Sequence, residues 1–217
     1  LPFILIFFIF PICSQELELH KYDVPFFHTS GGSIDAADFD GDGDMDIFLT
    51  GEMIENDEFA STLYLNDGNF DFDPAPNVFF PSIRNSHAVI SDFNSDGSPD
   101  LFYTGIDPNT EIRVTYLYHN NGDATFTIIN DHTLPAFRDG DIAYGDLNND
   151  GHADLVLGGN GVDGFFSGVF FNDGTGTFVN PESTALETLV NPNFDLGDFN
   201  GDGLLDIAMS GSQLYYF

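Results

Sequence analysis

The nine residues from Asp38 to Asp46 read DFDGDGDMD, and the same pattern of aspartate, asparagine and glycine returns three more times along the chain. Each copy fits Asp-x-Asp/Asn-x-Asp-Gly-x-x-Asp, and the later copies span residues 92–100, 146–154 and 198–206. Successive copies lie about 50 to 55 residues apart, a period typical of chains built from repeated supersecondary units. Four copies in phase therefore predict one acidic loop in each of four structural repeats.

Oxygen-bearing side chains alternate through each loop. A hard cation such as calcium takes six to eight oxygen ligands at about 2.4 Å, and a short loop can supply them from alternate positions. Glycine at position six permits a sharp bend that other residues adopt poorly. The pattern predicts about one calcium ion per repeat, four in all, with position seven binding through its backbone carbonyl. The predicted ligands are Asp38, Asp40, Asp42, Asp44 and Asp46; Asp92, Asn94, Asp96, Ser98 and Asp100; Asp146, Asn148, Asp150, His152 and Asp154; and Asp198, Asn200, Asp202, Leu204 and Asp206.

Three alternatives to calcium loops fit less well. Position seven has no shared chemistry, so the His152 side chain is not expected to bind metal, and the chain lacks the clustered His or Cys of a transition-metal site. An EF-hand needs an acid at position twelve, which here holds Leu49 in the first loop. Simple Asx-type turns remain open, although they do not require aspartate at position nine. Without a cation, neighbouring carboxylates repel by on the order of a few kcal/mol per pair.

The segments around the loops predict β-structure. After each loop comes a short apolar run that ends in glycine, such as residues 47–51 and 101–105, which suits strands covered on both faces. An aromatic hairpin follows, with Asn-Asp-Gly or Asn-Asn-Gly turns before Phe70, Phe126 and Phe178. A further strand precedes each loop, and the large apolar residue at position two is expected to pack in the core. These residues are Phe39, Phe93, Leu147 and Phe199.

Taken together, each repeat is predicted to form a four-stranded antiparallel blade. From about His28 onward, the loop motif followed by Ile or Leu resembles the FG-GAP or VCBS-type repeats of β-propellers, including the calcium-binding blades of the integrin alpha subunit. The resemblance implies an all-β propeller arc of three full blades and a partial fourth. In the partial blade, residues 213–217 align with the third strand of the earlier repeats. Blade boundaries are expected near 28–81, 82–135, 136–188 and 189–217. The Gly-Ala-Pro that is familiar in the family after this strand is replaced by pairs such as Thr50-Gly51.

The net charge and the N-terminal residues indicate the partners and the location of the protein. The net charge is −32, from 36 acidic residues against four Lys and Arg, so nucleic acid and anionic membranes are not expected partners. Residues 1–14 resemble an incomplete signal peptide that is too short to span a membrane, and residues 15–27 form a lead-in. Cleavage after Ser14 is expected, with lipidation of Cys13 as the alternative. The predicted location is secreted or cell-surface.

No constellation typical of an enzyme is present in the sequence. It has no Gly-x-Ser-x-Gly elbow and no His-Glu-x-x-His motif, and its six histidines are scattered through different repeats. We therefore expect a non-catalytic module that binds an extracellular protein or glycan. Two alternatives stay open: the propeller portion of an extracellular polysaccharide-degrading enzyme, and a structural spacer in an adhesin.

Overall fold

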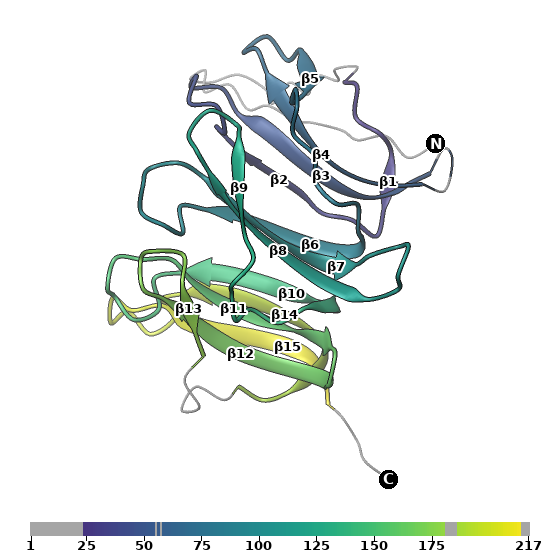
Figure 1. Cartoon of the computed structure of the whole chain (residues 1–217). Coiled ribbons are helices and arrows are strands. Elements are labelled where there is room, and N and C mark those ends of the chain that lie inside the picture. Colours follow the sequence, from purple (N-terminus) through teal and green to yellow (C-terminus); the bar gives the residue numbers. More distant parts are fainter. Residues whose placement is uncertain (1–23, 55, 57, 181–185, 214–217) are drawn as a thin grey trace, which may run out of the picture.

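The computed structural model describes residues 24–54, 56, 58–180 and 186–213, in which the chain forms strands and no helix. Figure 1 shows the sheets following one another along the chain, and we call them blades 1 to 4. Blade 1 contains β1 (Thr29–Ser30), β2 (Ile34–Ala37), β3 (Asp46–Met53), β4 (Glu58–Asn66) and β5 (Phe72–Pro74). Blade 2 contains β6 (Arg84–Ser91), β7 (Asp100–Ile106), β8 (Arg113–Asn120) and β9 (Phe126–Ile129). Blade 3 contains β10 (Phe137–Gly145), β11 (Asp154–Gly161), β12 (Gly164–Asn172) and β13 (Phe178–Val179), and blade 4 contains β14 (Leu189–Gly197) and β15 (Asp206–Gln213).

Within each blade the strands pair antiparallel in chain order, and β1 and β2 both pair with β3. The first strands of neighbouring blades contact one another, β2 with β6, β6 with β10 and β10 with β14, so they form the inner edge of the arc. This architecture confirms the predicted all-β propeller arc. Blades 2 and 3 have the expected four strands, while blade 1 has its first strand divided in two and blade 4 is described as a two-stranded sheet.

The second strand of each complete blade lies at the centre of the packing. In β3, β7 and β11 the first six residues are all buried, as expected for strands covered on both faces. One apolar core lies between blades 1 and 2 and includes Phe48, Leu101 and Tyr103; another, with Phe102 and Leu155, lies between blades 2 and 3. Because each core needs two sheets, the stacking of neighbouring blades and the burial of these runs depend on each other.

Blade 4 departs from two of the sequence predictions. Phe39 and Phe93 are fully buried, but Phe199 at the same loop position is 63% exposed and does not pack in a core. The reason is that the described chain places no further sheet against this part of blade 4. Gln213, which was expected to open the third strand, instead pairs with Leu189 at the end of β15. Residues 214–217 lie outside the described residues, and so do residues 1–23, which include the predicted signal peptide and Cys13.

The hairpins form as predicted with one correction. The residue equivalent to Phe126 and Phe178 is Phe72, which pairs with Asn66 and is 3% exposed. Phe70 lies in the turn with a left-handed backbone, φ 63°. The sequence prediction chose Phe70 because it follows the turn glycine closely, whereas the strand register places Phe72 toward the core.

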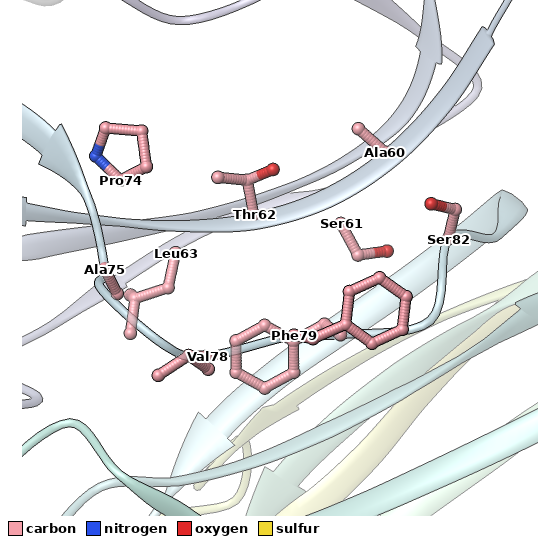
Figure 2. Close-up of a pocket in the computed structure, with 10 residues that line it drawn as sticks. Ala60, Ser61, Thr62, Leu63, Pro74, Ala75, Val78, Phe79 and Ser82 are labelled. Atoms are coloured by element: carbon pink, nitrogen blue, oxygen red, sulfur yellow. The ribbon is translucent and has the colours of Figure 1, made fainter.

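The chain passes from blade 1 to blade 2 through residues 75–83, which we call the first linker. Between this linker and β4 lies a cavity of about 240 Å³ (Figure 2). The linker residue Phe80 packs edge-on against Phe48 and Phe126, so the linker is anchored in the core beside the cavity.

Candidate metal centre

The four acidic loops share one backbone frame. In each loop the carboxylate at position one accepts a hydrogen bond from the N–H of the position-six glycine, at 2.9–3.0 Å. The glycine has a positive φ of 88–97° in every loop, which a residue with a Cβ adopts only under strain. The bend that the sequence predicted at position six is therefore present in all four repeats. The four glycines are Gly43, Gly97, Gly151 and Gly203.

Two further hydrogen bonds recur in every loop. The N–H of position five donates to the side-chain oxygen of position three, at 2.8–3.2 Å. The N–H of position seven donates to the carboxylate of position five, at 2.8–2.9 Å. These Asx-type turns hold the three side chains on the inside of the bend. Positions one, three and five thus share one hydrogen-bonded bend in each loop, and their role as metal ligands stays a prediction.

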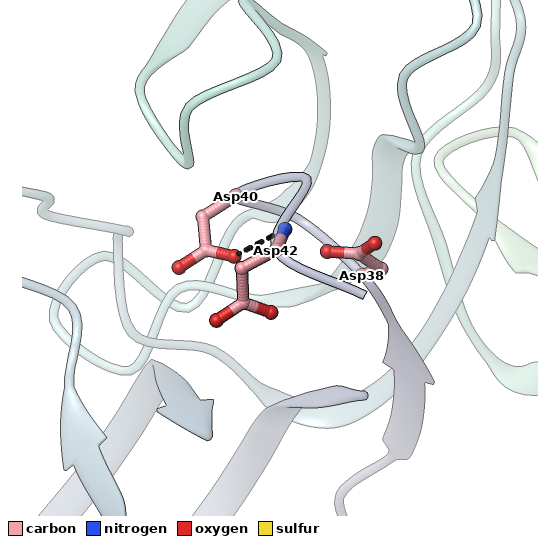
Figure 3. A group of neighbouring side chains, drawn as sticks. All are labelled: Asp38, Asp40 and Asp42. Carbon is pink, nitrogen blue, oxygen red and sulfur yellow. Dashed lines mark hydrogen bonds between the residues drawn. The ribbon is translucent and has the colours of Figure 1, made fainter. Parts of the chain in front are cut away.

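The first loop gathers the most negative charge. Carboxylate oxygens of Asp38, Asp40 and Asp42 all lie within 4.8 Å of one another, and Figure 3 shows these side chains extending from one turn of the loop. Partial burial raises the pKa of Asp40, and the charges of Asp42 and Asp38 raise it further. In the second loop the equivalent Asn94 instead donates its amide to Asp96, at 2.8 Å. The first loop therefore has the greatest electrostatic need for a cation.

The aspartate at position nine is placed differently from the others. Asp46, Asp100 and Asp154 are fully buried, with 0% exposure. One oxygen of Asp46 accepts the N–H of Phe39 in its own loop at 2.8 Å, and the other accepts the N–H of Asn66 in the hairpin at 2.9 Å. The other two make the same pair of contacts in their blades. Position nine therefore ties the loop to the hairpin of the same blade in blades 1 to 3.

Burial also changes the titration of these aspartates. It raises the pKa of Asp46 and Asp154, and it raises that of Asp100 to about 6, against the lowering effect of the backbone N–H donors. A buried carboxylate is costly unless it is paired, and a nearby cation would favour the charged form. The position-nine aspartates stay predicted metal ligands. In Asp100, Oδ2 already accepts two backbone N–H groups, those of Phe93 and Asn94, whereas Oδ1 accepts one, that of Asn120.

One set of functional residues was missed by the sequence reasoning. Asn120 at the blade 2 hairpin donates its amide to the carbonyl of Phe39 in the first loop, at 2.8 Å, and Asn172 donates in the same way to Phe93, at 2.8 Å. Both asparagines are buried. The hairpin of one blade thus holds the acidic loop of the preceding blade. An asparagine recurs 18 to 20 residues after position nine, and this was the signal in the sequence for the contact. The same asparagine is also expected of an ordinary turn, so the sequence did not distinguish the two roles.

Position seven has a separate role in the third loop. His152 makes a 2.9 Å hydrogen bond through Nδ1 with the hydroxyl of Ser95 in the second loop. The side chain therefore links two neighbouring loops, a role that position seven was not expected to have. The carbonyl groups of Asp44, Ser98, His152 and Leu204 stay predicted ligands.

The donor set fits a hard divalent cation. Positions one, three, five and nine offer carboxylate and amide oxygens in every loop, which suits calcium and not a metal that prefers nitrogen or sulfur. Backbone N–H groups of the loop hold the position-one carboxylate on the bend. Calcium bound there would neutralise the clustered carboxylates.

Antiparallel sheets stacked in an arc, each with an acidic loop between its first two strands, define a repeat module of the β-propeller class. A model of the FG-GAP-like repeat matches residues 38–103 and 92–157, and the chain belongs to this family. A search of the curated proteins gives no significant match. No helix in the described part of the chain is long and apolar enough to cross a bilayer.

Proposed function

We propose that this chain is a calcium-stabilised β-propeller module of a secreted or cell-surface protein. In this proposal, each of the four loops binds one calcium ion through positions one, three, five and nine and the carbonyl of position seven. The module itself is not catalytic, and it binds an extracellular protein or glycan. The bound ions brace the ends of the blades in a chain whose only cysteine lies outside the described residues.

The convergence of three carboxylates in the first loop carries this proposal. Their oxygens lie within 4.8 Å of one another, and the described loop supplies no cationic side chain to balance them. Two of the arginines pair elsewhere, Arg84 with Glu111 and Arg138 with Asp139. A divalent cation removes the repulsion and uses the oxygens that the loop frame already holds on one side of the bend.

The first test compares thermal unfolding with calcium and with a chelator. A ligand present at a hundredfold above its dissociation constant stabilises the folded protein by about 2.7 kcal/mol per site, so chelation should lower the melting temperature substantially. Magnesium at the same concentration serves as the control for ionic strength. An unchanged melting curve would refute structural calcium binding.

A second test ranks the loops by calorimetry. The first loop should bind most tightly, because Asp40 supplies a charge where the other loops carry Asn, and Asp44 adds another nearby. Asp42→Ala should therefore remove the tightest binding event, whereas Asp96→Ala should remove a weaker one. Asp40→Asn is the matched control, since it gives position three of the first loop the Asn that the other loops carry there. Equal affinities in these comparisons contradict the ranking.

A further inference from the structure

A second and larger cavity lies between the first linker and the hairpin of blade 2. Its volume is about 440 Å³, and it is lined by residues 76–80 of the linker, by residues 123–126 of the hairpin and by Asp40 of the first acidic loop. Phe79, which Figure 2 shows on the linker, lines both this cavity and the one beside β4. The linker thus borders two cavities, and Phe79 contributes to both.

Aromatic side chains form one wall of this cavity. The rings of Phe80, Tyr118 and Phe126 meet edge to face, with centroids 5.2–6.3 Å apart. Phe80 and Tyr118 are buried, whereas Phe79 is 82% exposed, the highest value among the large exposed apolar residues described. Phe79 therefore offers an accessible ring beside a wall that packing holds in place.

The charged groups of the cavity are acidic. The described residues that line it include Asp40 and Asp123 but no Lys, Arg or His. The hydroxyl and the backbone N–H of Thr125 both donate to Asp123 Oδ1, and they hold the pKa of this exposed carboxyl below its ordinary value. Asp123 is therefore charged at neutral pH. Since Asp40 belongs to the proposed calcium site, Asp123 is the carboxylate left for a ligand in the cavity.

The arginines of the protein do not neutralise this cavity. All three have partners elsewhere: Arg84 contacts Glu111, Arg113 contacts Asn160 and Arg138 contacts Asp139. The net charge of −32 also attracts basic segments of other molecules and repels acidic ones. The charge of the cavity therefore favours a cationic ligand.

The next junction between blades lacks both the ring and the charge. At the offset of 54 residues between the acidic loops, the residue equivalent to Phe79 is Thr133, whose hydroxyl donates to the carbonyl of Phe178 in the blade 3 hairpin, at 2.6 Å. This bond ties the linker to the hairpin, and a phenylalanine cannot make it. By the strand register of the hairpins, the residue equivalent to Asp123 is the neutral Thr175. The exposed ring and the free carboxylate are thus particular to the first junction.

We propose that this cavity binds an arginine side chain from a basic segment of a partner protein. The inference rests on the proposed function, in which the module binds an extracellular partner, and it states the chemistry of that partner. The guanidinium stacks on the ring of Phe79, whose electron-rich face attracts a cation, and its N–H groups donate to the carboxylate of Asp123. Arginine fits better than lysine, because its planar group stacks and donates at once, whereas the lysine ammonium is compact and strongly hydrated. Charge complementarity selects arginine over a neutral sugar, which would also stack on the ring.

The test titrates the full chain, at fixed free calcium, with the capped peptide Gly-Ser-Arg-Ser-Gly and follows the binding by NMR. Saturable binding is expected, with shifts in the first linker and the blade 2 hairpin. The matched control peptide carries citrulline in place of arginine, which keeps the shape of the side chain and removes its charge. The citrulline peptide should bind at least about fivefold more weakly, and raised ionic strength should weaken only the arginine peptide.

Variants of the protein test the two contacts separately. Asp123→Asn should weaken binding of the arginine peptide about two- to fivefold, the effect of one exposed charge pair. Its control is Asp173→Asn in the blade 3 hairpin, where the carboxylate accepts the same two bonds from Thr175, and this change should leave binding unaltered. Phe79→Leu should weaken binding by a similar factor, because it keeps an apolar side chain and removes the ring, whereas Phe79→Tyr should bind as wild type does.

Three results would overturn the proposal. The first is equal binding of the arginine and citrulline peptides, and the second is wild-type affinity in a variant that combines Phe79→Leu with Asp123→Asn. The third is saturable binding of methyl glucoside at these residues without binding of the arginine peptide, which would assign the cavity to a glycan. A melting temperature that depends on calcium, together with no arginine binding, would overturn this inference and leave the calcium sites standing.

Discussion

Replacement of Asn120 by alanine tests whether one blade holds the acidic loop of the blade before it. The Asn120 side chain is 1% exposed, and its amide donates to the Phe39 carbonyl at 2.8 Å. Its Oδ1 accepts the N–H of Gly122 at 3.0 Å. Each buried hydrogen bond contributes about 1 kcal/mol net. The Phe39 carbonyl keeps the N–H of Ala124 at 2.9 Å, so it is not left without a partner. The expected loss in the free energy of unfolding is therefore about 2 kcal/mol.

The assay is urea unfolding at fixed free calcium, with Asn66→Ala as the matched control. Asn66 occupies the same hairpin position in blade 1, but its amide donates at 3.1 Å to Met45 in its own blade, at an exposed site. Its removal should cost less than about 1 kcal/mol. Asn120→Ala should also weaken calcium binding at the first loop, because the loop loses a support from blade 2. The reasoning is refuted if both alanine variants lose the same stability and bind calcium equally.

Two further predictions concern backbone packing and pH. A Cβ on Gly140 would lie 1.9 Å from the carbonyl oxygen of Gly158, so Gly140→Ala should destabilise the protein by more than about 3 kcal/mol in thermal unfolding. Gly164→Ala should cost less, because its Cβ would meet no atom within 4 Å and only the positive φ of 122° opposes the change. Similar melting temperatures for the two variants would contradict this. Burial raises the pKa of Asp100 to about 6, so the folded protein holds a proton that the unfolded chain releases near pH 4. With calcium removed by a chelator, the free energy of unfolding should therefore fall as the pH rises from about 4 to about 6. Urea unfolding across this range should show that fall reduced in Asp100→Asn, and an unchanged slope in the variant would show that another group is responsible.

The loops and the central strands were predictable because their signals are local and repeated. Asp38, Gly43 and Asp46 stand at fixed spacing within nine residues, and the apolar run that follows needs only to be buried on both faces to form β3. Both features follow from short-range rules on turns and strands. The same rules also set the order of strands within a blade, since tight turns join consecutive strands into antiparallel pairs.

The connections between blades were not predictable from local patterns. Asn120 and Phe39 are 81 residues apart, and nothing near Asn120 in the sequence distinguishes a turn residue from one that holds another blade. The exposure of Phe199 was mispredicted for a related reason, because burial at position two depends on a neighbouring sheet and not on the residue itself. The cavity beside Phe79 and Asp123 likewise depends on two separated segments, the first linker and the blade 2 hairpin, which only the folded chain brings together.

The hairpin asparagines also bear on how such an array can be cut or extended. A segment that starts and stops at sheet boundaries would lack the asparagine that donates to the carbonyl of its last acidic loop. Its first hairpin would have no acidic loop before it to receive that hydrogen bond. A segment such as residues 38–126 keeps Asn120 on the first loop, but it separates the second loop from Asn172 in blade 3. Every junction of a chimera therefore has to place a hairpin with this asparagine beside the acidic loop that precedes it.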